Sequence, residues 1–265
     1  MFTDQEKNHA TSSKTQGKKK ASLHPNRQNN PLSDTLRLLR QGVAYKHVGR
    51  QHRMSNDDWY RRTAWSDSDR SEFQARLKRS RGDFNKSQYV RIQAHHLAAA
   101  NLPFCAVELL DQLFAEFPHD SQLAQAHLQY ADCMLALDRI DDAITAYRRA
   151  FDAEQAYPNS RSQLWLDFPW LIVTRGLSDL YHEVDIYLDW GGRSTTFPVE
   201  EFRMHTILAF LADANGDSTS SRTNAEAAIA AAAKEHSGFV RHPTVGLVGA
   251  PDTTVLSRLQ GLAGV

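Results

Sequence analysis

The chain has 265 residues, of which 41% are hydrophobic, and its 31 Lys/Arg balance its 31 Asp/Glu. This length suffices for one large or two small domains, with a core that needs no disulfide or metal. Two cysteines, no apolar run of about 18 residues and no apolar stretch near the N-terminus argue against a disulfide framework, a membrane span and a secretory signal. We therefore expect a cytoplasmic location.

The charge is unevenly distributed. Residues 1–53 carry 11 Lys/Arg against three acidic residues, a net charge of +8, so residues 54–265 carry −8. Residues 1–31 are polar and almost free of aliphatic side chains, which predicts disorder. A short basic helix is expected over residues 33–48, with Leu36, Leu38, Leu39 and Val43 as its apolar positions. We hypothesise that the whole basic tail, residues 1–53, is either dispensable or an over-long gene start.

An aromatic segment and a capping helix are expected over residues 54–85. Trp59, Tyr60 and Trp65 place three large rings within seven residues, which favours a packed lid over a solvated linker. Ser66 followed by an acidic first turn indicates a helix start, and we expect that helix to run to about Arg81 and end at Gly82.

Helical repeats are predicted over residues 86–237. One helix from about Lys86 to Ala100 is followed by another from Pro103 to Phe117, and residues 122–157 repeat this plan before Pro158. Small residues recur where two helices cross. They are Ala94 and Ala106 in the first unit and Ala131 and Ala143 in the second, twelve residues apart in each and 37 residues apart between units. A fixed period of this length is typical of stacked helix pairs.

Two further, less regular pairs follow. Val184 and Ser221 are the expected counterparts of Ala143, at spacings of 41 and then 37 residues, and Ala209 is the small crossing residue of the fourth unit. Pro169 should kink the first helix of the third pair or restart it. Residues 238–265 begin irregularly and end in an apolar stripe, Val255, Leu256, Leu259 and Leu262. This stripe predicts a short capping helix, or alternatively a dimer contact.

The second unit resembles tetratricopeptide repeats at Ala131, Ala143, Tyr147 and Ala150. The first unit matches at Ala94, Leu97, Ala106, Leu110 and Pro118, although Pro103 replaces the usual aromatic or aliphatic residue. The resemblance covers about residues 86–236. It implies an all-α fold, a right-handed α-solenoid of about four helix–turn–helix units preceded by the basic tail.

The resemblance also implies that the first helix of each pair faces a concave groove. The residues expected to point into it are Gln88, Arg91, His95, Gln125, Leu128, Asp132, Leu135, Arg203 and Phe210. Such a mixture of polar and apolar side chains suits an extended peptide or a partner helix. The family's known carboxylate clamp uses several Lys/Arg and Asn residues, and only Arg91 matches it, so that specificity does not carry over.

No pattern in the sequence requires catalysis, a cofactor or a metal. His95 and His96 are adjacent and so point about 100° apart on a helix, and no metal-binding spacing of His or Cys occurs. Cys105 and Cys133 lie in apolar patterns that do not activate a thiol. The acidic pairs Asp141–Asp142 and Glu200–Glu201 open helices, where they favour the helix dipole.

We therefore expect a protein- or peptide-binding scaffold or adaptor, as a monomer or homodimer, rather than an enzyme. One alternative is nucleic-acid association through residues 1–81, because a basic cluster crowds the predicted capping helix. The cluster comprises Arg70, Arg76, Lys78, Arg79 and Arg81. A second alternative is a regulatory sensor gated by a ligand, which rests on fold-level analogy. The basic cluster on the predicted capping helix could also be an ordinary solvated face.

Overall fold

A computed structural model describes residues 59–265, so the predicted tail and basic helix lie outside the described residues. The prediction of an all-α fold is confirmed for the described part. Its α-helices are α2 (Asp67–Arg79), α3 (Asp83–Ala99), α4 (Pro103–Glu116), α5 (Leu123–Ala136), α6 (Ile140–Ala156), α7 (Leu164–Thr174), α8 (Tyr181–Trp190), α9 (Pro198–Ala214), α10 (Ser218–Ala232) and α11 (Thr253–Ala263). A 3₁₀ turn, η1 (Ser178–Leu180), precedes α8.

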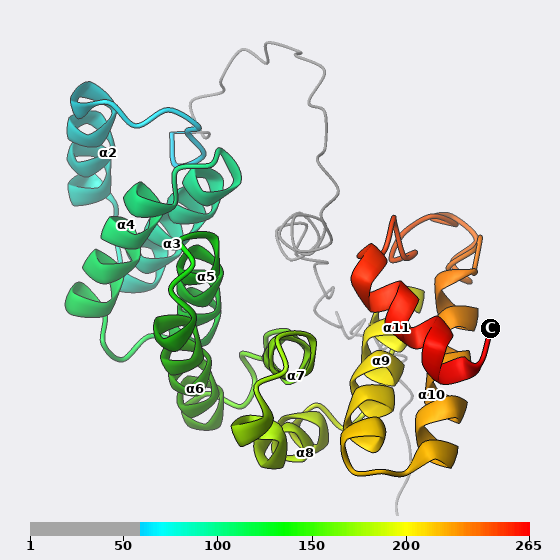
Figure 1. The fold of residues 1–265 in the computed structure, drawn as a ribbon. Coiled ribbons are helices and arrows are strands. Elements are labelled where there is room, and N and C mark those ends of the chain that lie inside the picture. The colour runs from blue at the N-terminus through cyan, green and yellow to red at the C-terminus, as the bar shows by residue number, and fades with distance from the viewer. Residues whose placement is uncertain (1–58) are drawn as a thin grey trace, which may run out of the picture.

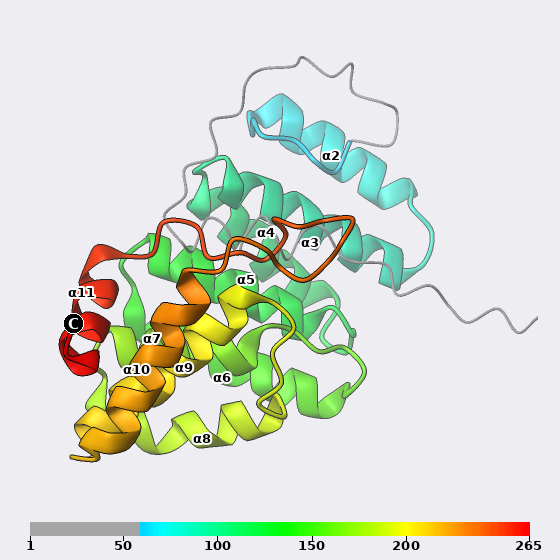
Figure 2. The ribbon, with the colours of Figure 1, turned by 90° about the vertical axis from the view of Figure 1, so that its right-hand side faces the viewer.

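The helices pack in neighbouring pairs, α3 with α4, α5 with α6, α7 with α8 and α9 with α10. Figure 1 shows the pairs following one another along an arc, with α2 at one end and α9 to α11 at the other. The view in Figure 2, a quarter turn away, shows α8 and α10 on the outside of their pairs. The first helices of the pairs, α3, α5, α7 and α9, lie toward the inner side of the arc.

The turn inside each of the four pairs has the same geometry. Each contains one residue with left-handed backbone, and these residues are Asn101, Asp138, Gly176 and Gly216, with φ of 62°, 58°, 65° and 75°. The amide that follows each donates to a carbonyl five residues earlier at 2.8–2.9 Å, as in Leu102 N to Leu97 O. This is the Schellman closure of a helix C-terminus, for which Gly and Asn are the preferred residues. The four turns are spaced by 37, 38 and 40 residues.

The predicted small crossing residues are buried. Ala94, Ala106, Ala131, Ala143 and Ala209 all have 0–1% of their surface exposed. Their expected counterparts in the later pairs, Val184 and Ser221, are also buried. Because these side chains are short, the axes of two paired helices can approach closely.

Equivalent helices of successive pairs are joined by side-chain bonds at a similar spacing. Gln74 of α2 donates to Gln112 of α4 at 2.7 Å, 38 residues on, and Arg148 of α6 pairs with Glu183 of α8, 35 residues on. Arg70 of α2 also pairs with Glu108 of α4. Thus α2 contacts α4 in the same way as α6 contacts α8. Helix α2 therefore takes the position that the second helix of a preceding pair would have.

The N-terminal end is closed by the aromatic segment. The Trp59 ring packs against Phe73 of α2 and Tyr89 of α3, at centroid distances of 5.3 and 5.1 Å. Ser66 caps α2, and Asp69 completes a reciprocal capping box with it. The helix ends at Arg79, two residues before its predicted end.

Two sequence predictions concerned the C-terminal half. A kink or a restart was predicted at Pro169, and the restart does not occur, because α7 runs through this residue from Leu164 to Thr174. Pro169 lies in the second turn of α7, where its missing N–H removes one helical hydrogen bond to Trp165 O.

At the end of the chain, Val255 and Leu259 of α11 are buried, and α11 packs on α10 and α9, so the apolar stripe covers the protein's own core. None of the helices described over residues 59–265 is both long and apolar enough to cross a membrane.

Candidate binding site on the inner side

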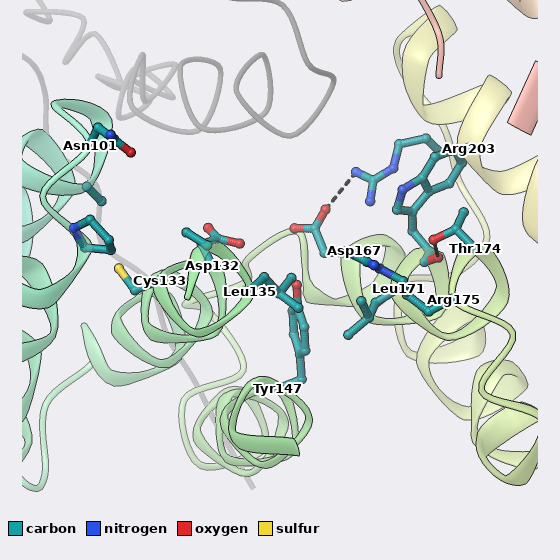
Figure 3. A pocket seen from close by; sticks show the side chains of 14 residues that line it. Asn101, Asp132, Cys133, Leu135, Tyr147, Asp167, Leu171, Thr174, Arg175 and Arg203 are labelled. Atoms are coloured by element: carbon teal, nitrogen blue, oxygen red, sulfur yellow. Dashed lines mark hydrogen bonds and ion pairs between the residues drawn. The ribbon is translucent and has the colours of Figure 1, made fainter. Parts of the chain in front are cut away.

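A cavity of about 500 Å³ lies on the inner side of the arc, between α5 and α7 and beside α9 (Figure 3). Most of its walls come from first helices: Asp132, Leu135 and Ala136 of α5, Trp170, Leu171 and Thr174 of α7. Tyr147 of α6 lies beneath them, and one end is closed by Asn101, in the turn between α3 and α4, and by Pro103 at the start of α4. We call this space the inner cavity. Its volume is in the range typical of ligand sites.

The far wall of the inner cavity is a buried ion pair between two helices. Arg203 Nη1 of α9 donates to Asp167 Oδ1 of α7 at 2.7 Å, and both side chains are less than a tenth exposed. The guanidinium also lies over the Trp170 ring, 5.1 Å from its centroid. Charges removed from water in this way hold one geometry, since their separation would leave an uncompensated charge. The pair therefore fixes α9 against α7 and gives the cavity a rigid polar wall.

Asp132 faces this wall from the other side. Figure 3 shows the Asp132 and Asp167 carboxylates on the two sides of the space between α5 and α7. Asp132 is half-buried, and Leu135 and Ala136 continue the α5 wall with apolar surface. On the α7 side, the exposed Arg175 follows Thr174. The cavity thus offers carboxylate, guanidinium and aromatic groups around a mainly apolar lining.

Cys133 also lines the inner cavity but is not equipped as a nucleophile. Burial is the main cause that raises the pKa of its thiol to about 12, so the thiol is protonated at neutral pH. Among the described residues, no cluster of three or more His, Cys, Asp or Glu side chains is placed to hold a metal ion.

Three of the residues predicted to face a groove line the inner cavity, namely Asp132, Leu135 and Arg203. Gln88 and Gln125 are half-buried on α3 and α5, outside the cavity. The structure differs from the prediction at the other four positions. Arg91, His95, Leu128 and Phe210 are only 2–4% exposed and do not line it.

Arg91 connects α3 to α5 instead of facing a ligand. Its Nε donates to Gln122 Oε1 at 2.7 Å, and the Gln129 amide, with its oxygen toward the guanidinium, accepts from Nη1 at 3.1 Å. Burial lowers the pKa of Arg91 to about 10, which leaves it charged at neutral pH. Arg91 therefore does not face a groove, because α5 packs over this part of α3.

His95 is buried in the same interface. Burial, with smaller contributions from the nearby His96 and Arg91, lowers the pKa of His95 to about 4, so its imidazole is neutral at physiological pH. Its Nδ1 has no hydrogen-bond partner in the described structure. Phe210 is likewise internal, under the Arg258 guanidinium of α11 at 3.9 Å from the ring centroid.

Sequence reasoning missed the α7 side of the site, comprising Asp167, Trp170, Thr174 and Arg175. A signal was available in the spacing. His95, Asp132, Asp167 and Arg203 follow one another at 37, 35 and 36 residues, one on each first helix. Counting one repeat back from Arg203 therefore finds its partner Asp167. The third pair was too irregular in sequence for this alignment to be made.

The basic residues of α2 are partly neutralised by the protein itself. Arg70 pairs with Glu108, and Arg76 pairs with Glu72 at 3.0 Å. Arg62, before the helix, pairs with Asp69 and Glu72. This face is therefore less cationic than the count of its basic side chains indicates.

Comparison of the chain with protein-family models, with curated proteins and with solved structures found no match in any of the three.

Proposed function

We propose that this chain is a scaffold or adaptor, not an enzyme, and that it binds a protein or peptide partner in the inner cavity. The observation that carries the proposal is the cavity itself, which is formed mainly by first helices of successive pairs. A peptide lying along the inner side would cross α5, α7 and α9 in turn, and it would meet both charged and apolar groups.

We further propose that the helix pairs form a right-handed solenoid of tetratricopeptide-like units. The four identical turns, spaced by 37, 38 and 40 residues, support this proposal. So do the side-chain bonds between equivalent helices at 35 to 38 residues. In such an architecture, each unit contacts only its neighbours, and the inner surface is left available for a partner.

The chemistry of the inner cavity supports a peptide as the ligand. Asp132 can accept from a Lys or Arg side chain, while Leu135, Trp170 and Leu171 can cover apolar side chains. A whole helix is about 10–12 Å in diameter. The cavity therefore takes a few anchoring side chains, with the rest of the partner lying along the arc.

Affinity purification of the full chain, followed by mass spectrometry, tests the proposal. The cavity variant Asp132→Arg/Thr174→Arg should lose the partner that wild type recovers, because two large cations fill the cavity and reverse the charge of one wall. The matched control Thr145→Arg/Gln155→Arg changes two exposed residues of α6 outside the cavity and should retain the partner. Identical partner lists for all three proteins would refute the proposal.

Nucleic-acid association through residues 1–81 remains an alternative that the structure does not favour. The carboxylate partners of Arg70 and Arg76 reduce the charge available for phosphates on α2. Regulation by a small ligand in the inner cavity is the other alternative. Such a ligand would contact the same cavity-lining residues as a peptide.

A further inference from the structure

The four charged side chains that line the inner cavity balance one another. Asp132 and Asp167 carry two negative charges, and Arg175 and Arg203 carry two positive charges. Asp132 alone would attract a Lys or Arg side chain, but the two guanidinium groups in the same lining repel it. The two carboxylates repel an acidic side chain in the same way. Since a charge also loses its hydration on entering a mainly apolar space, the lining favours a ligand without net charge.

The apolar part of the lining suits an aromatic ring. An apolar cavity of roughly 150 Å³ holds one benzene ring, and the inner cavity, at about 500 Å³, has room for more than that. The half-buried Trp170 presents an aromatic surface, against which a second ring prefers an offset or edge-to-face arrangement. The Arg203 guanidinium, 5.1 Å from the centroid of the Trp170 ring, holds that ring in place before a ligand arrives. The site is therefore preorganised for an aromatic side chain.

The polar groups of the lining can accept a hydrogen bond from such a ring. The Asp132 and Asp167 carboxylates lie on the two sides of the cavity (Figure 3). A carboxylate accepts several hydrogen bonds, so Asp132 can accept one from a ligand in addition to its contacts within the protein. A phenol O–H or an indole N–H donates such a bond without bringing a charge. We propose that the inner cavity binds an uncharged aromatic side chain with one hydrogen-bond donor, a Tyr or a Trp of the protein partner.

Other classes of side chain meet only part of what the lining offers. Phe fills the same space but offers the carboxylates no donor, and aliphatic side chains do not stack on the Trp170 ring. Lys, Arg, Asp and Glu each bring a charge that the balanced lining does not compensate. That the ring belongs to a protein partner rests on the proposed function, whereas the preference of the cavity for an uncharged ring with a donor does not.

Titration of the methyl-labelled full chain with side-chain analogues, followed by NMR, tests this preference. p-Cresol and 3-methylindole, the analogues of Tyr and Trp, should bind with a Kd on the order of 1 mM, as ligands of this size do. n-Butylammonium, n-propylguanidinium and propionate, the analogues of Lys, Arg and Glu, should bind at least about tenfold more weakly. The methyl resonances of Leu135, Ala136 and Leu171 should shift, and that of the exposed Ala156 at the end of α6 should not. A charged analogue that binds as tightly as p-cresol, or aromatic analogues that leave the cavity methyls unshifted, would overturn the proposal.

Removal of the donor from the probe tests the hydrogen bond. 4-Methylanisole is p-cresol with a methyl group in place of the hydroxyl hydrogen, so it keeps the ring and loses the donor. It should bind at least about threefold more weakly than p-cresol. Equal binding of the two would refute the proposed hydrogen bond.

A change in the charge balance tests the cause of the preference. Arg175→Gln removes an exposed cation and leaves the lining with a net charge of −1. The variant should bind n-butylammonium at least about threefold more tightly than wild type does, with a change of less than about twofold for p-cresol. The matched control Arg149→Gln changes an exposed residue of α6 outside the cavity and should alter neither. Circular dichroism establishes that both variants are folded. Unchanged binding of n-butylammonium to Arg175→Gln would show that the lining charges do not set the preference, and it would refute the proposal.

The outcomes separate this inference from the proposed function. If the cavity variant Asp132→Arg/Thr174→Arg loses the partner but the cavity binds charged analogues as tightly as p-cresol, the inference fails and the proposed function stands. If the cavity prefers p-cresol and 3-methylindole but the cavity variant recovers the same partners as wild type, the preference for an uncharged ring stands and the proposed function fails.

Discussion

At the scale of single residues, the inner cavity depends on a charge pair that is largely buried. Arg203 and Asp167 are 7% and 2% exposed and are joined at 2.7 Å. Burial of each charge alone is costly, and their contact offsets much of that cost. The pair is therefore expected to matter more for the position of α9 against α7 than for net stability.

Removal of one partner of this pair should be much worse than removal of both. Asp167→Ala should lower the free energy of unfolding by about 3–5 kcal/mol, because it strands a buried guanidinium. Asp167→Leu/Arg203→Met should recover most of that loss, since it replaces both charges with apolar side chains. Urea denaturation at pH 7 measures both effects. A double variant as unstable as the single variant would show that packing, not charge, holds this contact.

His95 predicts a dependence of stability on pH. Its pKa is about 4 in the folded chain and about 6.5 when unfolded, so the unfolded chain binds the proton more readily. The stability that this group contributes is complete above pH 6.5 and is lost as the pH falls toward 4. Between pH 7 and pH 5, this group should account for a loss of about 2 kcal/mol.

The variant His95→Met removes the titrating group while keeping a side chain that fits a core. Its free energy of unfolding should therefore fall by about 2 kcal/mol less than that of wild type between pH 7 and pH 5. Urea denaturation at the two pH values measures the difference. Parallel pH dependence in the two proteins would show that His95 does not titrate in this range.

At the scale of the elements, sequence reasoning succeeded where each pair kept its small residues. Helices α3 and α4 begin and end within a few residues of their predicted bounds, and α5 and α6 together fill the predicted segment 122–157, because Ala94, Ala106, Ala131 and Ala143 mark the crossings. The turns were recognised less well. Two of the four contain no glycine, since Asn101 and Asp138 adopt the left-handed backbone there.

The third pair was the element that sequence reasoning described least well. Pro169 breaks the expected pattern, yet α7 continues through it, and η1 inserts a turn before α8. As a result, the inward-facing residues of α7 were not aligned with Asp132 and Arg203. The cavity residues on α7 depend on how α7 packs against α9, which no local pattern in the sequence reveals.

Gly191, at the end of α8, leaves no room for a side chain. A Cβ atom there would lie 2.4–2.5 Å from three atoms of the Trp165 ring of α7, so Gly191→Ala must displace the ring or the helix end. We expect a loss of about 1–3 kcal/mol, as for overpacking of a core. Gly261→Ala is the matched control, since nothing lies within 4 Å of that Cβ inside α11, and it should stabilise by about 0.5–1 kcal/mol. Thermal unfolding followed by circular dichroism ranks the three proteins, and equal melting temperatures would contradict the close approach of α8 to Trp165.

At the scale of the whole molecule, α11 closes the C-terminal end of the arc. Leu259 is fully buried, and Arg258 pairs with Asp213 of α9 at 2.9 Å. Leu259→Asp should therefore expose the apolar surface of α9 and α10, and it should lower the free energy of unfolding by about 3 kcal/mol or more. Analytical ultracentrifugation should also show self-association of this variant. A monomer of unchanged stability would show that α11 does not cap the core.

Hydrogen exchange of the full chain, with and without the partner that wild type recovers, tests the central claim most directly. If the partner binds in the inner cavity, exchange should slow in α5, in α7 and at the start of α9, while α4, α8 and α10 stay unchanged. Slower exchange confined to α4, α8 and α10 would contradict the account.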